Sequence, residues 1–434
     1  MQELTDDEQA TLRKQIAALD YESALASLVD WSQMPDAALP AGKTHARLES
    51  WAQNKTGSTS KTSPPTADSL TTLLPASSST WHCVDLLTAL EQLLLSKQRR
   101  STHLHHATSS SGNKYWFVPK LAWPHGTRND RMPYGLANHL TRLRVVPAEL
   151  PQPNGIPFGV QLTELSARDA AAFRAHARGD LSGFLVHLET GVQLEMQNVG
   201  SRWYATGFSQ NDAAPTTILE RTQEASGCTF LVIPECTVPP DLRGAIAQTL
   251  AQMKTPAPLL TVAGSFHELE SGDLLPVNAA YVLDARGNEL IRHCKTFPAA
   301  LPGGHAEGIR THNELHALAT PIGLIAVAIC AEFSHASQAA NAFWSALAPD
   351  WMLVPSMGEE STLELHLATA SALQGTHKTT TLVANQPPTG TGFPGFVVDG
   401  GSQRRGQSRA DYPNDRRQPQ VNRRIPLSGK PELL

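Results

Sequence analysis

Three residues with reactive side chains each follow a short apolar segment in the second half of the sequence. Glu235 follows FLVIP, Lys295 follows LIRHC, and Cys330 follows GLIAVAI. In α/β proteins, reactive groups gather beyond the carboxyl ends of the strands, so we expect these three to lie close together. A carboxylate can take the proton of a thiol, and an ammonium group can stabilise the thiolate and a developing oxyanion. The set suits attack by the Cys330 sulfur on a carbonyl or nitrile carbon, with Glu235 returning the proton to the departing nitrogen.

Each of these residues also has an ordinary structural explanation when it is taken alone. A cysteine that ends an apolar strand is usually buried and inert. A lysine at a strand end is most often solvated. A glutamate after a proline can be a turn residue or a charge at a helix N-terminus. The catalytic interpretation therefore depends on the three residues converging.

The chain has five cysteines, an odd number at irregular spacings and without a CxxC pair. This pattern is typical of free thiols in a reducing cytosol, so we expect a cytoplasmic protein. Two cysteines adjoin the candidate glutamate and lysine, namely Cys236 and Cys294. Strand alternation would point both away from the site, as packing thiols. We expect structural roles for Cys83 and Cys228.

Beyond residue 200, short β-rich segments alternate with helical ones. Near-continuous apolar strands separated by helices are typical of an α/β fold with buried sheets. A hairpin is predicted over 278–295, with its turn at 284–288. Further strands are predicted at 228–234, 259–266, 322–330, 350–356 and 379–386, and helices at 241–253 and 363–377.

The sequence divides into four parts by composition. Residues 1–53 carry apolar side chains at helical spacing, and residues 54–80 form a Ser/Thr/Pro-rich linker. Residues 81–200 form an N-terminal region of unknown role. Residues 201–434 form the α/β domain with an Arg-rich C-terminal tail, although a domain start before Ser201 stays open. The first 200 residues fit a recruiting role, so a protein partner is expected there.

Charge and hydropathy argue against several classes of partner. The net charge is −5, so we expect neither a nucleic-acid partner nor binding to an anionic membrane. The chain has no apolar run of about 18 residues, and its N-terminus is acidic and polar, so no membrane span or signal peptide is expected. The histidine-rich segments 312–316 and 103–106 lack the order and the clear third ligand of a metal motif, so no metal is expected.

Six segments, in this order, resemble the motifs of the nitrilase, or carbon–nitrogen hydrolase, superfamily. TFLVIPEC is similar to its strand ending in Pro-Glu, VNAAYVLDARGNELIRHCKTFP to its lysine-bearing hairpin, and PIGLIAVAICAEF to the strand ending in Ile-Cys-x-Asp/Glu. DWMLVPS, LHLATASALQGTHKTTTLVANQ and GFVVDGGS resemble three later elements. The resemblance covers about residues 201–400.

This resemblance implies an α/β fold of a particular kind, a four-layer α-β-β-α sandwich of the nitrilase type, preceded here by a mostly helical N-terminal region. It implies hydrolysis of a non-peptide carbon–nitrogen bond, in an amide rather than a nitrile, through an intermediate bound to Cys330. Glu235 and Lys295 complete the triad. The resemblance implies no metal or organic cofactor. It also implies a homodimer or a larger homo-oligomer.

The resemblance suggests further site residues. Many family members use a second glutamate between the lysine and the cysteine, for which Glu307 is the first candidate and Glu314 the rival. Glu332, Phe333 and Asn385 are candidates for the substrate pocket. Two other functions stay open: acyl transfer to an amine rather than to water, and a catalytically inactive binding or scaffold protein.

Overall fold

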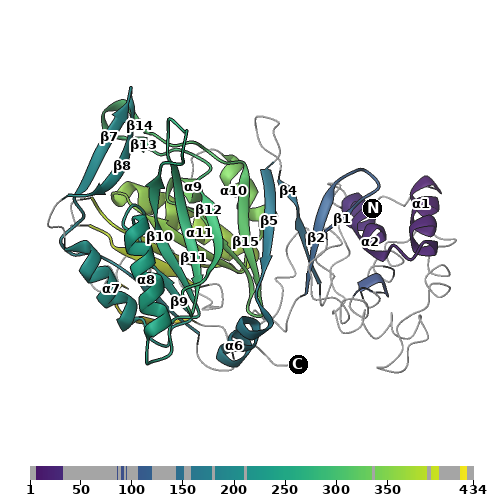
Figure 1. The fold of residues 1–434 in the computed structure, drawn as a ribbon. Helices are drawn as coiled ribbons and strands as arrows, with labels where there is room; N and C mark the ends of the chain where they lie inside the picture. The colour runs from purple at the N-terminus through teal and green to yellow at the C-terminus, as the bar shows by residue number, and fades with distance from the viewer. Residues whose placement is uncertain are drawn as a thin grey trace. The chain divides into compact units, whose positions relative to one another are not determined.

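In the computed structural model, the chain divides into two compact units, and the described residues have a mixed α/β structure with several sheets (Figure 1). The predicted linker at 54–80 and residues 400–420 of the Arg-rich tail lie outside the described residues. The structure describes residues 6–32, 86, 89–91, 94, 106–119, 143–150, 158–177, 181–209, 213–334, 338–388, 392–399 and 421–427.

The first unit comprises residues 1–122 and 126–150. Two helices and an antiparallel sheet of order β1-β2-β3 contribute to one apolar core. The strands differ from the mostly helical region that the sequence favoured. The segment KYWFVP explains this, because its aromatic and β-branched residues suit a half-buried strand. These elements are α1 (Asp6–Ala17), α2 (Tyr21–Ser32), β1 (His106–Thr108), β2 (Lys114–Pro119) and β3 (Leu143–Pro147).

The second unit comprises residues 123–125 and 151–434 and contains two large sheets. The first has the order β12-β11-β10-β9-β6-β20, with β6, β9 and β10 parallel. The antiparallel pairing of β11 with β12 confirms the predicted hairpin. Its strands are β6 (Ser182–Leu185), β9 (Phe230–Val232), β10 (Leu260–Glu268), β11 (Val277–Asp284), β12 (Glu289–Cys294) and β20 (Arg424–Pro426).

The second large sheet contains the order β19-β18-β17-β16-β15-β5. Strands β16, β17 and β18 are parallel, so their carboxyl ends meet at one edge of the sheet. They are almost entirely buried, as their continuous apolar sequences predict. The strands are β5 (Phe158–Glu164), β15 (Glu314–Thr320), β16 (Gly323–Val327), β17 (Trp351–Ser356), β18 (Thr380–Asn385) and β19 (Gly395–Val398).

A smaller sheet of order β13-β14-β8-β7 carries one of the predicted site residues. Glu307 ends β14, which pairs in parallel with β8, opposite Trp203. This pairing joins segments that are distant in the sequence, so its position could not be read from local pattern. The strands are β7 (Leu194–Val199), β8 (Arg202–Phe208), β13 (Ala300–Leu301) and β14 (His305–Glu307).

The two large sheets share one apolar core, to which the first contributes Val232 and the second Leu353 and Leu382. Leu231, one residue before Val232, instead belongs to a second cluster with Ile246 of α8, because successive strand residues face opposite sides. Helices α7 and α8 lie beside the first sheet in Figure 1, and α11 packs against β18 and β19. The helices are α6 (Ala167–Ala177), α7 (Ala214–Glu224), α8 (Pro240–Gln252), α9 (Ala331–Ser334), α10 (Gln338–Leu347) and α11 (Glu360–His377).

The second unit begins upstream of residue 201, where the sequence favoured a domain start. Strands β5 and β6 belong to its two large sheets. Residue 201 lies in the turn between β7 and β8, where Val199 pairs with Arg202. The strand β6, with the sequence SGFL, is too short for alternation to identify it.

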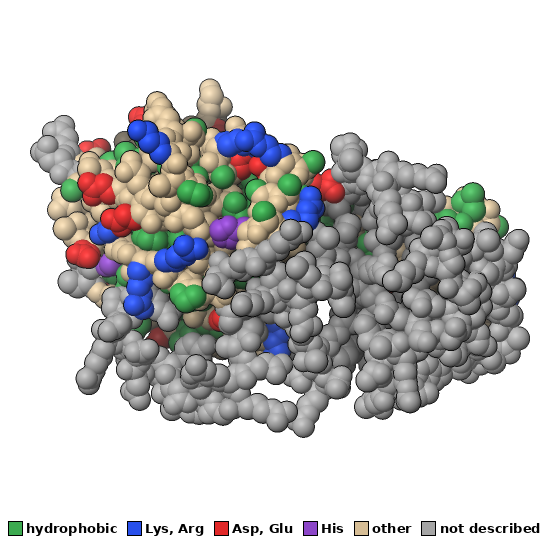
Figure 2. All heavy atoms as spheres, turned by 90° about the horizontal axis from the view of Figure 1, so that it is seen from below, with side chains coloured by type: hydrophobic (Ala, Val, Ile, Leu, Met, Phe, Trp, Pro, Cys, Tyr) green, Lys and Arg blue, Asp and Glu red, His purple; other side chains and the backbone are tan. Residues whose placement is uncertain are grey.

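No helix among the described residues is long and apolar enough to cross a membrane. Figure 2 shows one face of the molecule, on which acidic, basic and single apolar side chains are interspersed over the described part. Such a mixture is ordinary for a protein surface.

Candidate active site

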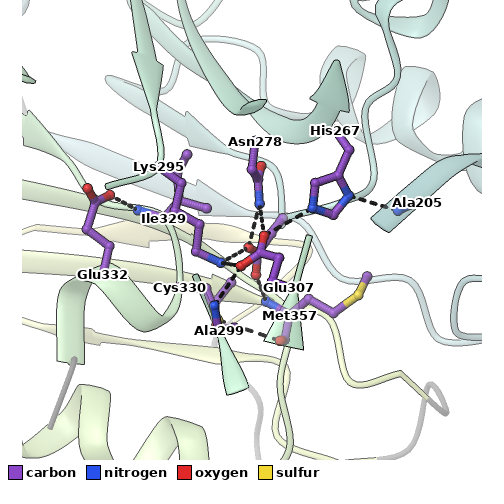
Figure 3. Close-up of polar contacts among 12 residues, drawn as sticks. Ala205, His267, Asn278, Lys295, Ala299, Glu307, Ile329, Cys330, Glu332 and Met357 are labelled. Carbon is purple, nitrogen blue, oxygen red and sulfur yellow. Dashed lines mark hydrogen bonds and ion pairs between the residues drawn. The ribbon is translucent and has the colours of Figure 1, made fainter. Parts of the chain in front are cut away.

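Four segments of the second unit bring reactive side chains together (Figure 3). Glu235 follows β9, Lys295 follows β12, Glu307 ends β14 and Cys330 follows β16. Direct hydrogen bonds join the lysine to both glutamates, and the thiol lies within electrostatic range of Glu235 and Lys295. The structure therefore brings together the three residues singled out first in the sequence and the preferred second glutamate.

The Lys295 ammonium group lies between two carboxylates. Its Nζ donates to Glu235 Oε1 and to Glu307 Oε2, each at 2.7 Å. The lysine side chain is 1% exposed, and both glutamates are buried. Burial alone would lower the pKa of Lys295, but Glu235 and Glu307 outweigh it and hold that pKa well above its usual range. The cluster therefore keeps a buried positive charge.

Glu307 has its acceptor positions filled. Oε1 accepts from Asn278 Nδ2 at 2.8 Å and from His267 Nε2 at 3.0 Å. Oε2 accepts from Lys295 Nζ and from the backbone N–H of Ala299 at 2.8 Å. Burial would raise the pKa of Glu307, but Lys295 and His267 together lower it below its usual range. Since a carboxylate offers about four acceptor positions, Glu307 can hold the lysine but has no room for another proton donor.

Glu235 has similar neighbours but one acceptor position to spare. Oε1 accepts from Lys295 and, at 2.9 Å, from Asn278 Nδ2. Among the described residues, Oε2 accepts one hydrogen bond, from the backbone N–H of Met357 at 3.0 Å. One lone-pair position on Oε2 therefore remains for a further proton donor. Of the two glutamates, Glu235 is the one that can act as a base.

Two polar residues inside strands complete the cluster, and the sequence did not reveal their roles. Asn278 of β11 donates to both glutamates, and its carbonyl accepts the backbone N–H of Lys295 at 2.8 Å. His267 of β10 accepts the backbone N–H of Ala205 at Nδ1, 3.0 Å away, so its Nε2 carries the proton that it donates to Glu307. Their position as polar residues inside buried strands could have identified them in the sequence. That position does not show which residues they bind.

Cys330 lies at a sharp turn between β16 and α9. Its φ of 48° is in the left-handed region, which costs a non-glycine residue about 1 kcal/mol. Its backbone N–H donates to the carbonyl of Pro355 at 2.9 Å. The thiol donates to the carbonyl of Met357 at 3.6 Å and accepts from the Ser356 hydroxyl at 3.4 Å. Because the N–H of Met357 also binds Glu235, one residue contacts both the thiol and the carboxylate.

The Cys330 thiol resists ionisation in its resting state. Burial raises its pKa to about 12, Glu235 acts in the same direction, and Lys295 and Ser356 oppose them. The whole residue is 4% exposed. At neutral pH the sulfur therefore carries its proton, and attack by this sulfur requires a base that takes the proton as the new bond forms.

The three pocket candidates lie beside these residues, and their described contacts are with other parts of the protein. Glu332 is 1% exposed and accepts the backbone N–H of Ile329 at 2.8 Å. Phe333 is fully buried. Asn385 donates through Nδ2 to two loop carbonyls at 3.0 and 2.8 Å. Contact with a substrate stays a prediction for all three.

The expectation that Cys236 points away from the site is based on strand alternation. Burial raises its pKa well above its usual range, and Glu235 and Glu307 raise it further, so the thiol lies within range of the charged cluster. It occupies a turn with a φ of 53°, where strand alternation does not apply. Cys228 and Cys294 pack in an apolar cluster, as predicted.

The rival glutamate and the HNELH histidines lie elsewhere. Glu314 is on β15 with a side chain 53% exposed, and its carboxylate lies 3.8 Å from His316 Nε2. His316 is on β15 and His312 precedes that strand, so the two histidines do not share a helical face. Among the described residues, no group of three or more His, Cys, Asp or Glu side chains could hold a metal ion.

Comparisons with known proteins find similarity at the level of structure. No protein-family model matches the sequence, and no curated protein matches it. An amidase from Nesterenkonia sp. matches with 16% identity and a TM-score of 0.37, over 55% of this chain and 97% of that one. Saccharomyces cerevisiae Nit3, a member of branch 10 of the nitrilase superfamily, matches with 16% identity and a TM-score of 0.37, over 52% and 85%.

The C. elegans NitFhit protein also matches, with 17% identity and a TM-score of 0.33, over 43% of this chain and 51% of that one. The similar structures thus include members of the nitrilase superfamily, which the sequence motifs resemble. Because these scores are low, we base the function on the motifs and on the geometry of the site.

Proposed function

We propose that the second unit is a carbon–nitrogen hydrolase of the nitrilase type, which cleaves a non-peptide amide through a covalent intermediate on Cys330. The observation that carries this proposal is the buried Lys295 ammonium held between Glu235 and Glu307, beside a cysteine at a strand end. Such a site combines a nucleophile, a base and a fixed positive charge, which acyl transfer requires. The six motifs in their expected order support the same chemistry.

The arrangement of the sheets supports the nitrilase-type four-layer α-β-β-α sandwich. The two large sheets share an apolar core. Helices α7 and α8 pack on one of them, and α11 packs on the other. In this arrangement the carboxyl ends of β9 and β16 carry Glu235 and Cys330 to a common place.

In the first half of the reaction, Oε2 of Glu235 takes the thiol proton while the Cys330 sulfur attacks the amide carbon. The carbonyl electron pair moves to the oxygen, and the resulting negative charge is stabilised by the Lys295 ammonium. Glu235 then gives its proton to the amide nitrogen as the carbon–nitrogen bond breaks. Ammonia or an amine leaves, and the acyl group stays on the sulfur as a thioester.

In the second half, Glu235 takes a proton from water, and the oxygen of that water attacks the thioester carbon. The carbon–sulfur bond breaks and the proton returns to the sulfur, which regenerates the resting thiol and releases a carboxylic acid. Glu307 takes no proton in either half. Its filled acceptor positions suit it to holding Lys295 in place.

Ammonia release from the full-length chain tests this proposal. The substrates are a panel of small aliphatic and aromatic amides, with the matching nitriles. Cys330→Ala should reduce ammonia release to the background rate, because no other group supplies the nucleophile. Cys228→Ala is the matched control, since that thiol packs in an apolar cluster, and it should keep the parent rate.

An alanine variant that releases ammonia at the parent rate would show that Cys330 is not the nucleophile. If the parent protein releases ammonia from nitriles but not from amides, the substrate is a nitrile and the proposed triad is unchanged.

A further inference from the structure

A chain of polar side chains, separate from the charged cluster, also reaches the Cys330 sulfur. Ser356, the last residue of β17, donates its hydroxyl to Sγ at 3.4 Å. The same hydroxyl lies 3.1 Å from Nε2 of His366 on α11. The other ring nitrogen, Nδ1, lies 2.6 Å from the hydroxyl of Ser334 on α9. Three elements thus contribute one chain that ends on the thiol.

The chemistry of the groups fixes the direction of every hydrogen bond in this chain. A serine hydroxyl has one hydrogen, and that of Ser356 is used on the Cys330 sulfur. Nε2 of His366 must therefore donate to the Ser356 oxygen. A neutral imidazole then has its lone pair on Nδ1, which accepts from Ser334. Every donor in the chain points toward the sulfur.

The surroundings keep the ring in this one form. His366 and Ser356 are fully buried, and Ser334 is 8% exposed. Burial lowers the pKa of His366 to about 3, and the charge of Lys295 acts in the same direction. The imidazole therefore stays neutral near physiological pH. Both ring nitrogens and both hydroxyls have partners, so the buried chain leaves none of its polar atoms unsatisfied.

We propose that Ser334, His366 and Ser356 form a directed hydrogen-bond chain that positions the Cys330 sulfur and stabilises its thiolate form. Aligned hydrogen bonds polarise one another, so the terminal donation from Ser356 is stronger than that of an isolated hydroxyl. When the thiol proton moves to Glu235, the chain already points its donors at the new negative charge. No proton moves along it, and His366 acts only through Ser356.

The sulfur also faces charged and titratable groups on other elements. Glu235 follows β9, Lys295 follows β12, and Cys236 lies in the turn after Glu235. These groups lie in the charged cluster, whereas the chain is neutral throughout. The purpose of this hydrogen-bond chain rests on the proposed function. Its effect on the thiol does not, because that effect can be measured without a substrate.

The test is the rate at which iodoacetamide alkylates Cys330 in the full-length protein, followed by peptide mass spectrometry between pH 7 and 9. Ser356→Ala removes the terminal donor. At a fixed pH we expect the rate to fall by about three- to tenfold, because one lost hydrogen bond to a thiolate shifts its pKa by about one unit and the added nucleophilicity partly offsets this. Ser356→Thr keeps the hydroxyl and should restore most of the rate.

His366→Phe keeps an aromatic ring, slightly larger than imidazole, without a donor and should give a smaller fall in the same direction. If Ser356→Ala does not fold, the alkylation rate of His366→Phe tests the proposal in its place. Thr381→Val is the matched control, because it removes a fully buried hydroxyl from the neighbouring strand β18, and it should leave the rate unchanged. Thermal unfolding of each variant separates a loss of stability from a loss of reactivity.

Unchanged alkylation in the fully folded Ser356→Ala variant, or in His366→Phe where Ser356→Ala does not fold, would overturn the proposal. The chain would then be a structural link between β17, α11 and α9. That result is distinct from failure of the proposed function, which is judged by ammonia release in the Cys330→Ala variant.

Discussion

Glu235 and Glu332 are both buried glutamates beside the reactive segments, but they differ in what binds them. Glu235 accepts from the Lys295 side chain and, as far as the described part of the chain goes, keeps one lone-pair position on Oε2. Glu332 accepts four hydrogen bonds and keeps none. Thr296 supplies two of them, through its N–H and its hydroxyl.

The other two donors to Glu332 are the N–H of Ile329 and Nε2 of His293, both at 2.8 Å. Ile329 precedes Cys330, and Thr296 follows Lys295, so one carboxylate ties together the two segments that carry the thiol and the ammonium. The difference teaches that burial alone does not mark a catalytic glutamate. A spare acceptor position beside the nucleophile suits proton transfer, whereas a filled carboxylate suits positioning.

The largest effect is expected from Glu235→Gln, which removes the base while nearly keeping the shape. Loss of a general base typically costs about 10²- to 10⁴-fold in rate. Amide hydrolysis at saturating substrate should fall by that amount. The free energy of unfolding should fall by about 2 kcal/mol, because the new amide nitrogen meets a donor that now faces a carboxylate oxygen. A rate within threefold of the parent would remove Glu235 from the role of base.

Lys295→Met should give the largest loss of stability. It leaves two buried carboxylates without their cation, and breaking a buried ion pair costs about 3–5 kcal/mol. Urea denaturation measures the change. Lys254→Met, at an exposed lysine of the same unit, is the control and should change the free energy of unfolding by less than about 0.5 kcal/mol. Similar losses in the two variants would contradict a charged cluster at this place.

Glu332→Gln sharpens the comparison with Glu235→Gln. In the parent, both carboxylate oxygens of Glu332 accept hydrogen bonds. In the variant, an amide nitrogen replaces one of these oxygens and faces its donors, so we expect a loss of about 3 kcal/mol in the free energy of unfolding. The rate per folded molecule should fall much less than in Glu235→Gln. Denaturation and active-site titration of the same samples give both quantities. The reverse pattern, with stability kept and the rate abolished, would make Glu332 a catalytic group.

The smallest effect concerns pH. His366 stays neutral in the folded protein down to about pH 3, whereas in the unfolded chain it binds a proton below about pH 6.5. The unfolded state therefore gains protons first, and the free energy of unfolding falls as the pH drops below 6.5. The share of His366 is about 1.4 kcal/mol per pH unit, or about 2 kcal/mol between pH 6.5 and 5.

His366→Phe should flatten this slope by that amount in urea denaturation at a series of pH values, and Thr381→Val should keep the parent slope. An identical slope in His366→Phe would show that the imidazole titrates alike in both states.

Local pattern predicted the strands and the residues that end them, because an apolar run that stops at a polar residue is visible without long-range information. Cys330 and Lys295 became candidates in this way. The choice of Glu307 over Glu314 was not settled by pattern, because it depends on β14 pairing with the distant strand β8. His366 was missed, since one histidine within a helical segment gives no sign of whether it is buried.

The start of the second unit was also beyond local pattern. Strand β6 is four residues long, and its neighbours in the sheet, β9 and β20, are distant in sequence. The alternation rule does not apply to Cys236, because this residue lies in a turn. For the start of the second unit the missing information is a contact between distant segments, and for Cys236 it is the local conformation of the backbone.

The central claim is that Glu235 and Lys295 make Cys330 the reactive thiol, and competitive labelling tests it most directly. The native protein is treated with limiting iodoacetamide, and the label on each cysteine is measured by peptide mass spectrometry. Cys330 should be labelled well before Cys228 and Cys294, although all three are buried, because Glu235 can take the thiol proton as the sulfur attacks. Glu235→Gln should remove this lead. Labelling of Cys330 no faster than Cys228, or a lead that survives Glu235→Gln, would contradict the account.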